Sequence, residues 1–113
     1  MFSLSLTSYP MTRNRTQRLK NKVCVVTGGA RGIGSTTAKL FAREGAKVAI
    51  MDVKDALGRN VAATIRRAGG DAIYCHADVT RSDEVAAVIR TVARRFGTIH
   101  VLFNNAGTAI VGS

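Results

Sequence analysis

The stretch TGGARGIGSTTAKLFAREGAKVAIMD, residues 27–52, decides the fold of this 113-residue chain. It places Gly28, Gly32 and Gly34 directly after a short apolar run, and a helix-like segment then leads to a second apolar run that ends at Asp52. Glycines between a buried strand and a helix permit unusual backbone angles and let an anion approach the helix N-terminus. A diphosphate fits such a turn, and an acid after the next strand can accept hydrogen bonds from both hydroxyls of an adenosine ribose.

The spacing of these glycines is G-x-x-x-G-x-G, which differs from the G-x-G-x-x-G of the general dinucleotide fingerprint. A glycine cluster alone is also typical of a tight strand-to-helix turn that binds no ligand. Here the helix, the second strand and the terminal acid accompany the glycines, and this combination favours a nucleotide.

Outward from this stretch, strands and helices alternate. Apolar runs predict buried strands over residues 23–27, 47–51, 72–77 and 99–103. Periodic segments predict helices over residues 35–44, over residues 55–68, and from Ser82 to Gly97. The order βαβαβαβ, with right-handed crossovers, predicts an α/β fold: a Rossmann-like doubly wound parallel sheet of strand order 3-2-1-4. Ligands of such sheets bind where the crossovers reverse, here between strands one and four.

Two of the helices carry signals that can be tested residue by residue. Leu57, Val61 and Ile65 are spaced by four and are expected to form the buried face of the second helix. Ser82 is expected to be the N-cap of the third helix, whose apolar stripe ends at Phe96.

Three motifs, in this order along the chain, resemble those of the short-chain dehydrogenases/reductases. TGGARGIG, residues 27–34, resembles the T-G-x-x-x-G-x-G cofactor loop of that family. Asp78 and Val79 look like its adenine-contacting pair, and NNAG, residues 104–107, is similar to its N-N-A-G segment. The resemblance covers nearly the whole body of the chain and implies a nicotinamide cofactor.

The resemblance also implies a role for each matching position. Five loop residues would wrap the pyrophosphate: Gly28, Arg31, Gly32, Ile33 and Gly34. Asp52 would hold the adenosine ribose, and Asp78 and Val79 would meet the adenine. Three residues after the fourth strand would run beside the nicotinamide-side ribose: Asn105, Ala106 and Gly107.

Some of these positions also have a purely structural interpretation. Asp78, followed by Val79 and Thr80, could simply begin a turn. The asparagines could tie the end of the fourth strand to its neighbours through side-chain hydrogen bonds, and for Asn104 we expect this role rather than ligand contact.

The choice between NAD and NADP depends on two residues with opposite effects. Asp52 would repel a 2′-phosphate and so favours NAD. Arg31 lies in the glycine loop, where it could attract that phosphate, pack over the adenine or reach solvent. We expect NAD, with NADP less favoured, because an acid directed at the ribose penalises the phosphate directly.

No catalytic residue is assigned in these 113 residues. The family's chemistry needs a tyrosine acid/base with a lysine four residues later, together with a serine. Tyr9 and Tyr74 are followed at that distance by Arg13 and Asp78, and Ser113 comes too soon after NNAG to be the family's serine.

We therefore expect the amino-terminal fragment of an NAD(P)-dependent dehydrogenase, truncated after the fourth strand and inactive alone. The parent activity would be hydride transfer between the cofactor and an alcohol or carbonyl compound. A non-catalytic nucleotide-binding module is the alternative. A sheet truncated here is also expected to have an unpaired edge beyond the fourth strand. Oligomerisation is left open, because the family's usual interface elements would be missing.

The net charge of +10 is divided between a leader and the body of the chain. Residues 1–22 hold five of the seventeen basic residues and none of the seven acids. We expect a disordered basic leader over residues 1–22 and a partial dinucleotide-binding domain over residues 23–113. The leader could be an organelle transit peptide, although an upstream start codon before Met11 is favoured, with a cytoplasmic location.

The rest of the composition argues against three classes of partner or site. The remaining basic residues scatter over predicted helix surfaces and aromatic residues are few, so nucleic acid is not expected as a partner. No apolar stretch has the length of a membrane helix. Cys24 and Cys75 fall on strands separated by another strand, about 10 Å apart and beyond disulfide reach. Together with His76 and His100 they lack the close spacing of metal ligands, so no metal site is expected.

Overall fold

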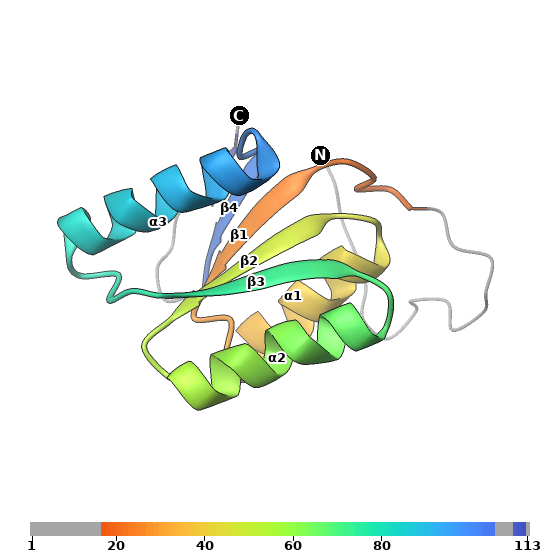
Figure 1. Cartoon of the computed structure of the whole chain (residues 1–113), viewed down its shortest axis with the longest axis horizontal. Helices are drawn as coiled ribbons and strands as arrows, with labels where there is room; N and C mark the ends of the chain where they lie inside the picture. Colours follow the sequence, from red (N-terminus) through yellow and green to blue (C-terminus); the bar gives the residue numbers. More distant parts are fainter. Residues whose placement is uncertain (1–16, 106–109, 113) are drawn as a thin grey trace.

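The computed structural model describes residues 17–105 and 110–112 of the chain. They form a twisted sheet with helices on both of its faces (Figure 1). The elements follow one another as β1 (Val23–Thr27), α1 (Gly32–Arg43), β2 (Lys47–Asp52), α2 (Asp55–Arg67), β3 (Asp71–His76), α3 (Ser82–Phe96), β4 (Val101–Asn104) and β5 (Ile110–Gly112).

The strand order is β3-β2-β1-β4-β5, and the first four strands are parallel. The predicted order 3-2-1-4 and the Rossmann-like fold are therefore confirmed. β1 lies between β2 and β4: the first two crossovers lead outward from β1 to β3, and the third returns across the sheet and places β4 on the other side of β1. The carboxyl ends of β1 and β4 meet at that reversal, where open α/β sheets bind their ligands.

β1 is buried on both faces, and its side chains alternate between two cores. Cys24 and Val26 pack into the core under α1 and α2, whereas Val23 and Val25 pack into the core under α3. Figure 1 shows the same division, with α1 and α2 on one face of the sheet and α3 on the other. Because strand side chains point alternately to opposite faces, a strand covered on both sides needs apolar residues at every position.

α2 buries a different face from the one predicted. Val61 and Ile65 are buried, but Leu57 is 45% exposed, so its assignment to the buried face is wrong. Its neighbour Gly58 is buried instead. Residues spaced by four drift around a helix, whereas Gly58, Val61, Ala62 and Ile65 follow the i, i+3, i+4, i+7 pattern that keeps to one side.

Several predicted boundaries are also wrong. α1 begins at Gly32 and not at residue 35, so the last glycines of the loop form its first turn. Ser82 is the first residue of α3, so Arg81 and not Ser82 takes the N-cap position. The Arg81 N–H donates to the Asp78 main-chain oxygen at 2.9 Å, which closes a turn just before the helix. β4 begins at Val101 and not at residue 99.

The edge beyond β4 is paired, contrary to the expectation. β5 runs antiparallel to β4, with Phe103 opposite Ile110 and Val101 opposite Gly112. Antiparallel strands need only a short connection, so a neighbouring segment of the same chain can take this edge. The exposed edge of the parallel part of the sheet is therefore β3.

Residues 17–22, the last part of the predicted leader, contact the body of the chain. Leu19 is 8% exposed and belongs to the core under α1 and α2. The Arg18 guanidinium pairs with the buried Glu44 carboxylate at 3.3 Å, and the Leu19 N–H donates to the Glu44 main-chain oxygen at 2.7 Å. The rest of the predicted leader, residues 1–16, lies outside the described residues.

Both cysteines are free thiols. Cys24 lies on β1 and Cys75 on β3, with β2 between them, as the sequence predicted. Burial raises the pKa of the Cys24 thiol to about 11. At ordinary pH this thiol is protonated and behaves as a small apolar core residue.

Membrane-spanning helices and clusters of metal ligands are both absent from the described residues. None of their helices combines the length and the hydrophobicity needed to cross a bilayer. Within the same residues, no three histidine, cysteine or acidic side chains gather closely enough to hold a metal ion. His100 has a structural contact instead, since its Nδ1 accepts a hydrogen bond from the Val23 N–H at 3.0 Å.

Candidate nucleotide-binding cleft

The glycine loop continues directly from β1. Gly28 extends the pairing with β2, because its N–H donates to the Met51 oxygen at 2.8 Å. Gly28 and Gly32 have φ angles of +65° and +60°, a region that residues with side chains rarely adopt. Gly34 is needed for a different reason: a side chain there would run into the main-chain oxygen of Gly28. The start of α1 is thereby pressed against the loop.

The N-terminus of α1 faces this loop without a side-chain cap. Arg31 occupies the N-cap position in an extended conformation and makes no capping hydrogen bond, and the first turn contains no acidic residue. The first N–H groups of a helix have no partner within the helix, and the helix dipole adds partial positive charge there. The arrangement therefore suits an anion such as a diphosphate.

Asp52 ends β2 beside the loop. Its Oδ2 accepts a hydrogen bond from the Ala30 N–H at 3.1 Å, which links the glycine loop to β2. Its Oδ1 accepts the N–H groups of Val53 at 2.7 Å and Lys54 at 3.1 Å. These bonds orient the carboxylate and leave it partly exposed to the cleft.

The end of β4 is tied to the end of β1 through one hydroxyl. Thr27 Oγ1 donates to Asn104 Oδ1 at 2.9 Å and accepts the Asn105 N–H at 3.0 Å. Asn105 Nδ2 also lies 3.4 Å from the Gly28 oxygen, to which it donates. Asn104 thus makes the strand-to-strand hydrogen bond that the sequence predicted for it.

Thr27→Val is expected to lower the free energy of unfolding by about 2 kcal/mol, because it leaves the Asn105 N–H without its acceptor in a partly buried contact. The shape of the side chain is kept, so packing changes little. Urea denaturation followed by circular dichroism measures the loss. Thr64→Val, which removes an exposed hydroxyl bonded to the Asn60 oxygen, is the matched control. An equal loss in both variants would contradict the tie.

These elements enclose a cleft of about 500 Å³ at the carboxyl ends of β1 and β2. Six of the predicted site residues line it: Gly28, Arg31, Gly32, Ile33, Asp52 and Asn105. Gly34 lies beneath the loop, and Ala106 and Gly107 lie outside the described residues. The walls carry the cations of Arg31 and Lys54 and one carboxylate, a balance that suits a diphosphate joined to an uncharged ribose.

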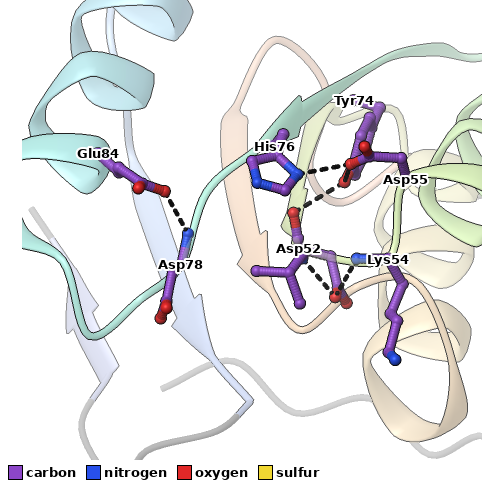
Figure 2. Close-up of polar contacts among 8 residues, drawn as sticks. Asp52, Lys54, Asp55, Tyr74, His76, Asp78 and Glu84 are labelled. Atoms are coloured by element: carbon purple, nitrogen blue, oxygen red, sulfur yellow. Dashed lines mark hydrogen bonds and ion pairs between the residues drawn. The ribbon is translucent and has the colours of Figure 1, made fainter.

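Val53 and Lys54 also line the cleft and were not predicted. Figure 2 shows the Lys54 side chain directed away from Asp55 and His76. A signal for both residues was present in the sequence. They follow the strand-terminal acid directly, and the loop after a strand lies at the ligand-binding edge of such a sheet.

Asp78 and Val79 do not line the cleft. The Asp78 carboxylate accepts the Thr80 hydroxyl at 2.7 Å and the Thr80 N–H at 2.9 Å, a turn that matches the structural interpretation of this pair. These two bonds lower the pKa of Asp78. The Asp78 N–H donates to Glu84 on α3 at 2.9 Å (Figure 2). Val79 is 39% exposed.

Sequence reasoning missed a polar cluster behind Asp52, made of Tyr74, His76 and Asp55 (Figure 2). The Tyr74 hydroxyl lies 2.6 Å from Asp55 Oδ1 and 2.8 Å from the main-chain oxygen of Asp52, so two acceptors share its proton. His76 Nδ1 lies 2.6 Å from the same Asp55 oxygen. Tyr74 and His76 are two residues apart and therefore share one face of β3, but nothing in the sequence places Asp55 beside that face.

These contacts shift the pKa of each member. The hydrogen bond from Tyr74, followed by that of His76, lowers the pKa of Asp55. Burial, followed by the bond to Asp55, raises the pKa of Tyr74. The bond to Asp55 raises the pKa of His76 above its ordinary value of 6.5. Near neutral pH the cluster therefore contains an ionised Asp55 and a neutral tyrosine.

The contribution of His76 to stability is expected to fall as pH rises. Because the folded state raises the His76 pKa, the contribution is complete below the ordinary value of 6.5 and is lost as pH passes the raised value. The difference in free energy of unfolding between the wild type and His76→Gln should be larger at about pH 5.5 than at about pH 9. Urea titrations at both pH values test this, with His100→Gln as control. A constant difference for His76→Gln would contradict it.

Three comparisons relate the chain to known proteins. The family model described as short chain dehydrogenase matches residues 22–113. Zerumbone synthase of Zingiber zerumbet is 49% identical over 92 residues, which are 80% of this chain and 33% of that protein. Tropinone reductase-like 2 of Erythroxylum coca is 46% identical over 91 residues, which are 80% of this chain and 32% of that protein.

A solved structure resembles the fold as well as the sequence. The hydroxysteroid dehydrogenase from Escherichia coli superposes with a TM-score of 0.78 and is 34% identical, covering 81% of this chain and 39% of that one. The chain thus spans about a third of the length of the curated relatives it matches, at 32% and 33%.

Proposed function

The chain belongs to the short-chain dehydrogenase family, and we propose that it binds a nicotinamide dinucleotide as the cofactor-binding part of an oxidoreductase. The observation that carries the proposal is the convergence of two features on one cleft. An uncapped helix N-terminus behind a glycine loop faces it, and so does the Asp52 carboxylate. The first suits a diphosphate and the second a ribose.

The residues of the cleft fit such a cofactor. Gly32 has open space where a side chain would stand, so the backbone there is free to receive the pyrophosphate. In the proposal Gly28, Arg31, Gly32, Ile33 and Gly34 shape the pyrophosphate site. Asp78 and Val79 meet the adenine, and Asn105, Ala106 and Gly107 lie along the nicotinamide-side ribose.

We propose NAD rather than NADP as the preferred cofactor. The Asp52 carboxylate is oriented by three main-chain N–H groups and lines the cleft, where it would repel a 2′-phosphate. Arg31 and Lys54 line the same cleft and would attract it. An acid that accepts both ribose hydroxyls penalises the phosphate directly, so its effect outweighs that of two exposed cations.

The bound cofactor would supply hydride transfer, with an alcohol or carbonyl compound as the substrate class. The names of the relatives, a reductase-like protein and a hydroxysteroid dehydrogenase, support this parent activity. Neither tyrosine of the 113 residues is followed by a lysine four positions later, so the proposal for this chain is cofactor binding and not turnover.

Titrating the full chain with NADH while following nicotinamide fluorescence tests the proposal. We expect saturable binding in the micromolar range, and tighter binding of NADH than of NADPH. A short DNA duplex, which is negatively charged like NADH, is the control. The protein's net charge of +10 would attract the duplex without using the cleft. Failure of NADH to bind saturably, or displacement of NADH by the duplex, would refute the proposal.

A further inference from the structure

We propose that Tyr74 is a positioning residue for Asp52. Its hydroxyl holds the loop between β2 and α2 in the form that presents the Asp52 carboxylate to the adenosine ribose. This inference rests on the proposed function and adds a residue outside the cleft to it. Tyr74 belongs to β3 and is not among the residues that line the cleft.

The Tyr74 hydroxyl joins the two ends of this loop. It lies 2.8 Å from the main-chain oxygen of Asp52, where the loop begins, and 2.6 Å from Asp55 Oδ1, where α2 begins (Figure 2). Only Val53 and Lys54 lie between these residues, and both line the cleft. One hydroxyl therefore restrains this loop at both of its ends.

The phenol ring is itself held in place. Tyr74 pairs with Ile50 across the β2–β3 ladder, which sets the height of the ring along the sheet. Gly58 of α2 lies against the ring so closely that a side chain there would run into it. The Arg59 guanidinium lies 5.8 Å from the ring centre. A ring confined by a strand, a helix and a cation delivers its hydroxyl to a defined point.

Asp55 is held from a second side by β3, since His76 Nδ1 lies 2.6 Å from its Oδ1. The direction of the Asp52 carboxylate depends on the same loop. Its Oδ1 accepts the N–H groups of Val53 and Lys54, so any change in the path of the loop turns the carboxylate. The Ala77 N–H also donates to the Asp52 main-chain oxygen, at 3.0 Å, so the Tyr74 hydroxyl is one of two restraints on that oxygen. Loss of the hydroxyl removes the link between the two ends of the loop and would therefore loosen the group that reads the ribose.

A role restricted to packing would give a different result from a positioning role. The test uses NADH and NADPH, which differ only at the 2′ position of the adenosine ribose. The ratio of their dissociation constants isolates the contact made by Asp52 and cancels any general loss of folded protein. Tyr74→Phe keeps the ring and its packing and removes only the hydroxyl.

In the full chain, Tyr74→Phe is expected to reduce the preference for NADH over NADPH by about fivefold, chiefly through weaker NADH binding. Thr91→Val is the matched control, because it removes a hydroxyl that donates to a main-chain oxygen, that of Ala87, on α3. It should leave the ratio unchanged. Urea denaturation of each variant confirms that the titrated protein is folded.

The outcomes separate this inference from the function on which it rests. A wild type that prefers NADH, with the same ratio in Tyr74→Phe, would overturn the positioning role and leave the proposed function intact. Equal wild-type affinity for both cofactors would refute the role given to Asp52, and the inference with it. A wild type that binds neither cofactor would refute the proposed function itself.

Discussion

Gly34→Ala is expected to abolish measurable NADH binding and to lower the free energy of unfolding by about 3 kcal/mol, the upper range for forcing extra volume into a packed site. The added methyl group would run into the main-chain oxygen of Gly28, a residue that is fixed to β2 because its N–H donates to the Met51 oxygen. The φ angle of Gly34 is not among the positive ones, so the penalty is one of space and not of backbone angle. NADH titration and urea denaturation measure the two effects.

Gly69→Ala is the control for this variant. Gly69 follows α2 with a φ of +95°, and nothing lies within 4 Å of the position that a side chain would take. Alanine there carries only the cost of a left-handed backbone, about 1 kcal/mol. It should leave NADH affinity unchanged. If Gly34→Ala bound NADH as tightly as Gly69→Ala does, the close approach of α1 to the glycine loop would not be required for binding.

Local signals were sufficient to predict the part of the cleft formed by the glycine loop after β1 and by Asp52 at the end of β2. β1 is an unbroken apolar run because it is buried on both faces, and the glycines after it are required by backbone angle or by space. Asp52 ends β2 next to this loop because parallel neighbours align their carboxyl ends. In each case the cause lies within a few residues of the signal, so the sequence pattern carries it.

The cluster behind Asp52 could not be predicted in the same way. Tyr74 and Asp55 are 19 residues apart, and their contact depends on the register of β3 against β2 and on the start of α2. Nothing in the local pattern distinguishes this tyrosine from an ordinary strand residue. The pairing of β5 with β4 was missed for a related reason, because β5 has three residues, which are too few to show a strand period.

The turn at Asp78 shows where a sequence leaves two interpretations open. An aspartate two residues before a threonine favours a local turn, and the family motif assigns the same residue to the adenine. The structure contains the turn, with both Thr80 donors on the carboxylate. An adenine contact through the exposed Val79 side chain or through the main chain is compatible with this arrangement and stays a prediction.

Asp52→Arg is expected to weaken NADH binding by about 100-fold, the effect of losing hydrogen bonds to a charged group. The preference should change to NADPH, because a guanidinium would replace the acid that repels the 2′-phosphate and would join Arg31 and Lys54 in the cleft. The Ala30, Val53 and Lys54 N–H groups lose their shared acceptor, so stability should fall by about 2 kcal/mol as well. Paired titrations with both cofactors measure the change.

Asp71→Arg separates the role of the site from that of charge. Asp71 is an exposed acid at the first position of β3, whereas Asp52 ends β2, so the same change of two charge units is made at the opposite end of the sheet. A general attraction to the net charge of the protein would strengthen NADPH binding to a similar extent in both variants, since both change that net charge by the same amount. A site at the carboxyl ends of β1 and β2 requires the reversal of preference in Asp52→Arg only. NADPH preference in both variants would therefore argue against the cleft as the cofactor site.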